Sequence, residues 1–335
     1  MRRVLVPADV DPAGPALGGQ LHTLQGRTMG TTWSVRFVGP AAPDLPSWQQ
    51  GIQAQLDAVV AEMSPWEPAS DLSRFNRAEA GTWRVLPPAC FEVLAHGLDV
   101  ARRSGGACDP AAGALVNLWG FGPTGRYDEP GFQAPADAEV QAVREQGGWE
   151  RLAVDAGARR VLQPGGIELD FSGIAKGFGV DQVAAYLSRR GVHDHLVEVG
   201  GELKGTGVKP DGQPWWVALE TPPGAALDDT VVALHGLAVA TSGDYRRFFE
   251  VAGHRHAHTI DPRDGRPVHN GVASVTVLHR ACVLADAWST ALTVLGPDEG
   301  LALADREGLA AHTIVRGADG RVHERWSRAF EGMMS

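Results

Sequence analysis

The order of strand-like and helix-like segments is the feature that most constrains this fold. Residues 31–38 alternate in side-chain character as a strand does, and residues 46–63 then carry apolar side chains at helical spacing. Later helical patterns lie near residues 91–101, 134–147 and 281–295. Strand-like runs lie near residues 195–240, 272–278 and 311–315, so the two types follow each other in no regular order. Because no regular βαβ rhythm joins them, the sequence favours an α+β fold over a doubly wound parallel sheet.

A single domain is expected over residues 25–330, with mixed, largely antiparallel sheets and flanking helices. Neither an internal repeat nor a low-complexity linker divides this part of the chain. The 42 glycines and 22 prolines among 335 residues are typical of a protein with many tight turns. Residues 1–24 contain three prolines and three glycines, and we expect them to form a flexible lead-in.

Composition argues against several classes of function. A net charge of −10 disfavours binding to nucleic acid, which needs a basic surface. The three cysteines are odd in number and far apart and form no CxxC pair, so we expect buried thiols and no disulfide framework. Neither a signal-peptide core nor an apolar run of about 18 residues is found, which predicts a cytoplasmic protein without a membrane span, or a periplasmic one if the true start lies elsewhere.

The segment 168–181 carries the most chemical information. A short strand is expected to end at Asp170, with Ser172 as the N-cap of an apolar-striped helix. Lys176 then falls in the first helical turn, where free backbone N–H groups and the helix dipole favour an anion. The residues alone leave two interpretations open: a phosphate or flavin site with Asp170 at its rim, or a capped helix carrying a solvated lysine.

The cations of this chain are skewed in type, with three lysines against 27 arginines. GC-rich coding accounts for the excess of arginine, and on that basis Lys204 and Lys209 are expected to be incidental. Lys176 stands at the start of the informative helix, where we expect a compact ammonium group to be required.

An acidic residue interrupts the apolar helix expected over residues 281–295. Asp286 lies among apolar side chains, so its carboxylate must be paired, coordinated or protonated. Thr290 is four residues on and therefore on the same helix face, and Ser289 is beside it. A carboxylate with hydroxyls is a hard oxygen set suited to Mg²⁺, and the alternative is an ion pair between Asp286 and an arginine.

Histidines alternate at positions 254, 256 and 258, just before a turn that carries Asp-Pro and Asp-Gly. A three-histidine zinc site is one interpretation, but no nearby cysteine or helical HExxH supports it. His258 alone, acting as a base, is the interpretation we favour.

Glycine-rich segments give weaker signals. Residues 120–125 match GxGxxG but no helical pattern follows directly, and no GxxxxGK[ST] occurs, so dinucleotide and P-loop motifs are excluded. The sequence Gly200-Gly201-Glu202, after an expected strand, brings the backbone close to a ligand or forms a bulge.

Taken together, these segments resemble the ApbE family of FAD:protein FMN transferases. The resemblance runs in order through TMGTT (28–32), MSPWEPASDLSRFN (63–76), CDP (108–110) with LVNLWGFG (115–122), DFSGIAKGFGVD (170–181), VGG (199–201), ATSGDY (240–245), HTIDPRDGRP (258–267) and ADAWSTALTVLG (285–296). It implies an ApbE-like domain that binds FAD with Mg²⁺, passes the FMN part to a Ser or Thr hydroxyl of a target flavoprotein, and releases AMP.

The resemblance also implies roles for individual residues. Its implied catalytic residues are His258 and Asp286. Its implied metal ligands are Gly173, Asp286, Ser289 and Thr290. Its implied flavin-contact residues are Met29, Trp66, Ala107, Cys108, Asp109, Asp170, Lys176 and Ile260. The chain departs from the family pattern where Trp66 replaces a usual tyrosine, Cys108 a phenylalanine, and Ala111 and Asp264 threonines.

Two other functions would use the same segments. An Mg²⁺-dependent FAD pyrophosphatase would give FMN and AMP with water as the nucleophile, and a non-catalytic protein would hold FAD unchanged. Neither the acceptor protein nor an oligomeric state follows from the sequence.

Overall fold

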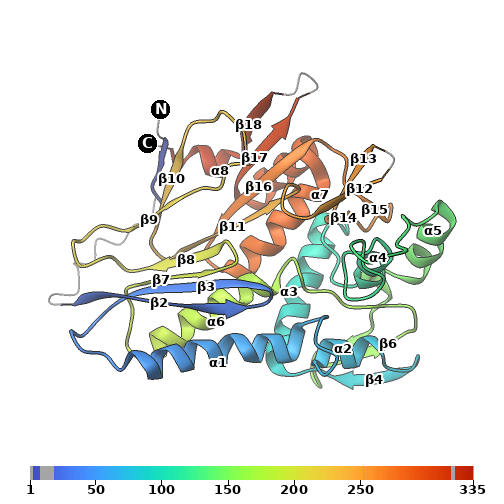
Figure 1. Cartoon of the computed structure of the whole chain (residues 1–335), viewed down its shortest axis with the longest axis horizontal. Coiled ribbons are helices and arrows are strands. Elements are labelled where there is room, and N and C mark those ends of the chain that lie inside the picture. The colour runs from blue at the N-terminus through green and yellow to red at the C-terminus, as the bar shows by residue number, and fades with distance from the viewer. Residues whose placement is uncertain (1–2, 8–18, 252, 318–320, 335) are drawn as a thin grey trace.

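An antiparallel sheet of eight strands forms the centre of the molecule (Figure 1). The structure is a computed structural model that describes residues 3–7, 19–251, 253–317 and 321–334. In spatial order the strands are β18 (Val322–Trp326), β17 (Ala310–Arg316), β16 (Val272–His279), β11 (Leu237–Gly243), β8 (Glu202–Thr206), β7 (His195–Val199), β3 (Thr31–Gly39) and β2 (Gln20–Thr28). Every neighbouring pair is antiparallel, which confirms the predicted α+β class.

Two helices cover one face of this sheet and contact each other. α6 (Ala175–Arg189) packs on β7 and β8, whereas α7 (Cys282–Glu307) packs on β11 and β16. α1 (Leu45–Met63) lies against α6, and α3 (Pro88–Ser104) lies against α7 (Figure 1). The predicted helices over 46–63 and 91–101 are thus confirmed, and their apolar faces enter the cores shared with the two central helices.

The opposite face of the sheet carries a separate core. A three-stranded sheet of β1 (Arg3–Leu5), β10 (Thr230–Leu234) and β9 (Trp215–Ala218) covers it, together with α8 (Arg328–Glu331). Leu5 and Phe330 are buried there.

Shorter elements surround the central layers. They are α2 (Asp71–Asn76), β4 (Thr82–Val85), α4 (Gly113–Leu118), α5 (Asp137–Gln146), the 3₁₀ helix η1 (Trp149–Arg151), β5 (Val154–Asp155), β6 (Arg160–Gln163), β12 (Phe248–Val251), β13 (His254–Ala257), β14 (Ile260–Asp261) and β15 (Arg266–Pro267). Within the described ranges, no helix is both long enough and apolar enough to cross a bilayer.

The N-terminal segment differs from the expected flexible lead-in over residues 1–24. Arg3–Leu5 forms β1, parallel to β10, and β2 already begins at Gln20. Both strands depend on partners distant in sequence, so local composition gave no sign of them. The prolines and glycines behind that expectation lie mostly at 8–18, outside the described residues.

The start of α6 is also corrected. Ser172 is not its N-cap: the helix begins at Ala175 after Ile174. The backbone N–H of Ser172 instead donates to Oδ1 of Asp170 at 2.6 Å, and this local turn delays the helix. Lys176 still lies in the first turn, as predicted.

Candidate active site

The site is built where the start of α6 meets the first half of α7. Gly177 makes this approach possible, because a Cβ there would lie 2.7 Å from the carbonyl carbon of Cys282 and 2.8 Å from the Cβ of Asp286. The Gly177 N–H donates to Oδ2 of Asp286 at 2.9 Å. Asp286 therefore accepts a hydrogen bond from a backbone N–H of α6. The arginine that the sequence offered as an alternative partner is not the group it pairs with. Burial raises the pKa of Asp286, while the charge of Lys176 and the Gly177 N–H oppose that rise.

Hydroxyl groups collect beside this carboxylate. Thr290 follows Asp286 by one turn, and the loop before α6 runs against it, since a Cβ on Gly173 would lie 2.8 Å from Thr290 Oγ1. Ser242 on β11 lies 2.7 Å from Ser289 Oγ and 3.2 Å from Thr290 Oγ1. Ser289 Oγ also donates to the backbone oxygen of Asp286 at 2.8 Å. The structure thus brings together the four predicted metal-binding positions and adds Ser242, which the sequence reasoning did not select.

Lys176 has a partner that the sequence did not predict. Its Nζ lies 2.5 Å from Oε1 of Glu202, the first residue of β8. The Glu202 side chain is 2% exposed and that of Lys176 is 31% exposed. Burial raises the pKa of Glu202, and the Lys176 ammonium opposes this. The Gly200-Gly201 turn before Glu202 indicated either a bulge or a close approach of the backbone to a ligand. Nothing in the local sequence indicated that the Glu202 carboxylate would pair with Lys176.

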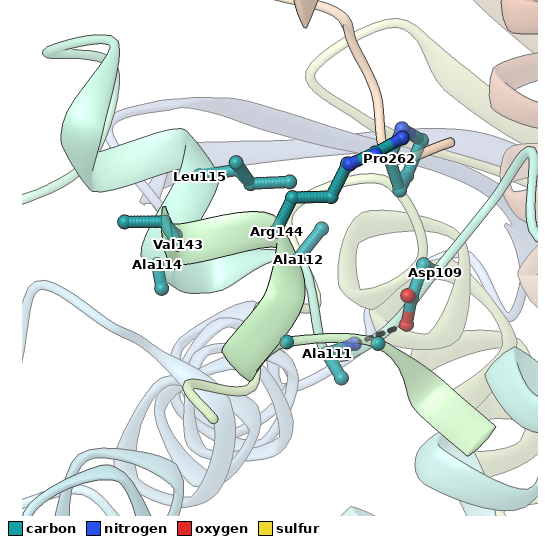
Figure 2. Close-up of a pocket in the computed structure, with 10 residues that line it drawn as sticks. Asp109, Ala111, Ala112, Ala114, Leu115, Val143, Arg144 and Pro262 are labelled. Carbon is teal, nitrogen blue, oxygen red and sulfur yellow. Dashed lines mark hydrogen bonds between the residues drawn. The ribbon is translucent and has the colours of Figure 1, made fainter. Parts of the chain in front are cut away.

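Three predicted flavin-contact positions, Ala107, Cys108 and Asp109, are consecutive in the loop after α3, and we call residues 107–110 the 107–110 wall. Asp109 accepts backbone hydrogen bonds from Ala111 at 2.7 Å and Trp149 at 3.1 Å, and it borders a cavity of about 30 Å³ (Figure 2). Burial raises the pKa of Asp109 to about 6 in spite of those bonds. Burial also raises the pKa of the Cys108 thiol to about 12, and the charges of Asp109, Asp286 and Asp170 add to this effect. The thiol is therefore protonated and unreactive at neutral pH.

Backbone contacts join this wall to the start of α6. The Asp170 N–H donates to the carbonyl of Pro110 at 2.9 Å, so the 107–110 loop and the segment leading into α6 lie side by side. Ala107 is buried in the core that also contains Phe171 and Ile174.

Met29 reaches the same helix from the sheet. It occupies the two-residue turn between β2 and β3 with a φ of +48°, and Gly30 follows at +70°. Such turns need positive φ at both central residues, which a methionine adopts only at a cost. A Cβ on Gly179 would lie 3.2 Å from Met29 Cε, so the methionine lies over α6.

Trp66 and Ile260 pack against other segments of the chain. Trp66 follows α1 and is 43% exposed, with the Arg126 guanidinium 5.7 Å from its ring centre. Ile260 is buried in a cluster with Trp119 and Phe121, and Trp119 Nε1 donates to the Gly265 carbonyl at 2.7 Å. The indole thereby holds the turn that follows His258.

His258 lies just after β13, at the edge of the Phe121 ring. Its Nδ1 is 3.1 Å from the carbonyl oxygen of Arg247. Because a carbonyl oxygen only accepts, Nδ1 carries the proton, and Nε2 is left as an acceptor. Burial lowers the pKa of His258 to about 4, with Lys176 and Asp244 among the charges that act on it. The imidazole is neutral near pH 7, the form that takes up a proton.

The three alternating histidines do not converge. His256 stacks on Phe249 at 4.9 Å between ring centres, and His254 is exposed. Among the residues whose placement is described, no group of three or more histidine, cysteine, aspartate or glutamate side chains is arranged to hold a metal. One carboxylate with hydroxyls and a backbone carbonyl is a different kind of oxygen set, which needs only one of those side chains.

Comparison with known proteins places this geometry among relatives. A model of the ApbE family matches residues 29–313. The FAD:protein FMN transferase of Vibrio cholerae is 37% identical over 321 residues, which cover 94% of this chain and 93% of the relative. That of Haemophilus influenzae is 36% identical, covering 90% and 88%. The apo crystal structure of the Pseudomonas stutzeri flavinyl transferase ApbE matches with a TM-score of 0.86 at 37% identity, covering 95% and 98% of the two chains.

Proposed function

This chain belongs to the ApbE family, and on that premise we propose the reaction and the residue roles that follow. It is an FAD:protein FMN transferase, an enzyme that passes the FMN part of FAD to a protein acceptor. We propose that the acceptor group is a Ser or Thr hydroxyl.

The reaction is a phosphoryl-type substitution at the phosphorus nearer the flavin. The acceptor oxygen forms a bond to that phosphorus while the bond to the bridging oxygen of the pyrophosphate breaks. AMP leaves with the bridging oxygen and its electron pair, and the hydroxyl proton passes to a base. The protein must therefore accept one proton and stabilise negative charge on the leaving AMP.

His258 is the proposed base. Its Nδ1–H is committed to the Arg247 carbonyl, which fixes the ring and leaves Nε2 to accept the proton. Its lowered pKa keeps it neutral at physiological pH, although it also makes His258 a weak base. We therefore propose that it takes the proton late, as the new oxygen–phosphorus bond forms and the hydroxyl becomes acidic.

A divalent cation, Mg²⁺, fits the oxygen set at the α6–α7 contact. Asp286, Thr290 and the carbonyl of Gly173 would hold it, because all three offer hard oxygen ligands, Gly173 lies against Thr290, and Thr290 follows Asp286 by one turn of α7. The Ser289 hydroxyl already donates to the Asp286 backbone and would mainly position this set. When bound, the cation neutralises the pyrophosphate and favours the departure of AMP.

FAD is proposed to lie between the β2–β3 turn, the 107–110 wall and the start of α6. Met29 and Trp66 offer surfaces for the flavin ring, and the Ala107–Asp109 loop, Asp170 and Ile260 border it. Lys176, in the first turn of α6, faces the phosphates, where the helix N-terminus adds to its positive charge.

The observation that carries the proposal is the contact between the starts of α6 and α7, which gathers a buried carboxylate, hydroxyls and an ammonium group at one point. The test incubates the protein with FAD, Mg²⁺ and an acceptor protein that carries a Ser/Thr flavinylation motif. A fluorescent acceptor with the mass of one added FMN group, together with AMP, is expected, and an acceptor with that hydroxyl removed must stay unlabelled.

Two variants sharpen this experiment. Asp286→Asn is expected to reduce transfer at least 100-fold, because a neutral amide cannot replace the buried carboxylate. Asp298→Asn is the matched control, since Asp298 lies on the same helix but is exposed and pairs with Arg325. Release of free FMN and AMP without labelling would identify a pyrophosphatase, and unchanged FAD would identify a binding protein. Either result would refute the transferase.

A further inference from the structure

Two ion pairs of opposite direction join α6 to β8. In one, helix residue Lys176 pairs with strand residue Glu202 at 2.5 Å. In the other, helix residue Asp181 pairs with strand residue Lys204 at 2.6 Å. Glu202 and Lys204 are two apart and therefore share one face of the strand. The two pairs thus connect the same elements, but the lysine is on the helix in one pair and on the strand in the other.

The Asp181–Lys204 pair has the features of a structural contact. Oδ1 of Asp181 meets Lys204, and its Oδ2 accepts a hydrogen bond from the backbone of Val283 on α7 at 3.0 Å. Both carboxylate oxygens are satisfied, and the pair connects three elements. This contact corrects the expectation that Lys204 is incidental.

The Lys176–Glu202 pair is incomplete by the same measure. Glu202 is buried, yet its Oε2 has no hydrogen-bond partner among the residues the structure describes. A buried ion pair generally adds little stability even when complete, because both charges lose their water. A buried carboxylate with one unsatisfied oxygen is costly for a fold and indicates a role in the site.

The exposure of the two partners gives the direction of that role. Glu202 is buried, whereas Lys176 keeps about a third of its side chain exposed to solvent. The stem of Lys176 runs along the Gly200 turn, since a Cβ on Gly200 would lie 3.3 Å from Lys176 Cδ. Asp286 is near enough for its charge to act on the same ammonium. The four-carbon stem of a lysine is flexible, so Glu202 and the glycine turn together define where its charge stands.

We propose that Glu202 is a positioning residue, which holds the Lys176 ammonium at the start of α6 so that it meets the phosphates of FAD. This role rests on the proposed function. It assigns Glu202 no contact with FAD, and it makes the Gly200–Gly201 turn the means by which the lysine stem approaches the site.

The sign of the effect tests the idea. Glu202→Gln keeps the size of the side chain but loses its charge. If Glu202 positions Lys176, this variant binds FAD at least 10-fold more weakly and raises the KM for FAD, with a smaller change in kcat. Glu202→Asp, which keeps the charge, recovers part of the affinity. If Glu202 only neutralised Lys176, its loss would free the ammonium and FAD would bind more tightly.

Two further variants separate function from structure. Lys204→Met removes the other α6–β8 pair and should leave FAD affinity within about twofold. Lys176→Glu combined with Glu202→Lys keeps an ion pair but reverses it, so the protein should fold while FAD binding is lost.

FAD affinity is measured by quenching of flavin fluorescence, and folding by circular dichroism and urea unfolding. Folded Glu202→Gln protein with unchanged or tighter FAD binding would overturn the proposal, as would a reversed pair that binds FAD normally. If Glu202→Gln does not fold, Glu202→Asp decides: its shorter side chain shifts the carboxylate, so FAD should bind more weakly than to the wild type, and unchanged or tighter binding would overturn the proposal. Wild-type protein that binds FAD but transfers nothing would instead refute the proposed function.

Discussion

The contact between α6 and α7 allows a quantitative test with one methyl group. Gly177→Ala places a Cβ against backbone atoms of Cys282 and the Cβ of Asp286, at 2.7 and 2.8 Å, and none of these belongs to a flexible side-chain end. Overpacking of this kind costs about 1–3 kcal/mol or more, whereas replacing a helical glycine by alanine gains up to about 1 kcal/mol. We expect a net loss of about 1–3 kcal/mol in the free energy of unfolding.

Gly179→Ala is the matched control, two residues along the same helix. Its Cβ would meet only the ends of the Met29 and Leu56 side chains, at 3.2 and 3.3 Å. These ends can shift by a few tenths of an ångström, so the alanine should be neutral or stabilise the protein by up to about 1 kcal/mol. The two variants should therefore differ by about 1–4 kcal/mol.

Urea unfolding without FAD or Mg²⁺ measures this difference, with the slope of the transition checked for each variant. Gly177→Ala should also lose FMN transfer, because moving α7 displaces the carboxylate that accepts the Gly177 N–H. Equal unfolding midpoints for the two alanine variants would refute the argument that this glycine sets the α6–α7 approach.

Two further predictions concern protonation. His258→Asn should lower kcat by about 10²–10⁴-fold with little change in FAD affinity. The pH–rate profile of the wild-type enzyme should show no titration of His258 from about pH 5 upward, because the pKa of His258 is lowered to about 4. A rise in rate near pH 6.5 that disappears in the variant would contradict this. Burial raises the pKa of Glu324, but hydrogen bonds from His312 and Arg3 outweigh this effect and bring the pKa to about 2, below its ordinary 4.5. Its contribution to stability is therefore present above about pH 4.5 and lost as the pH falls towards 2, so Glu324→Gln should cost about 2–3 kcal/mol at pH 7 and flatten the acid limb of the unfolding curve. Parallel acid limbs would argue against this.

Local patterns were sufficient where an element depends on its own residues. The helix over 46–63 has its apolar stripe in sequence, and so does the helix predicted near 91–101, which is α3 and ends before Gly105 at a φ of +64°. β1 could not be predicted, because its partner β10 lies more than 200 residues away and three residues carry no period. The start of α6 was misplaced because two turn-forming side chains competed, and the Asp170 carboxylate took the hydrogen bond.

The residues of the site could likewise be predicted where they are close in sequence, and were missed where only packing brings them together. Asp286 and Thr290 could be paired from helical spacing, since they lie on one face of one helix. Glu202 was missed as a partner of Lys176 because the two are 26 residues apart, and only the packing of α6 on β8 brings them together. Ser242 was missed for the same reason, since its strand and α7 are distant in sequence.

The scarcity of lysine in this chain takes on a different meaning beside the α6–β8 contact. Two of the three lysines stand there, each opposite one carboxylate. A guanidinium carries five N–H donors in a rigid plane, more than one carboxylate can satisfy in a half-buried space, whereas an ammonium group is compact. The contact therefore explains lysine at both positions, and lysine alone does not mark Lys176 as functional. What distinguishes Lys176 is its partner, because Asp181 satisfies both of its oxygens within the fold and Glu202 does not.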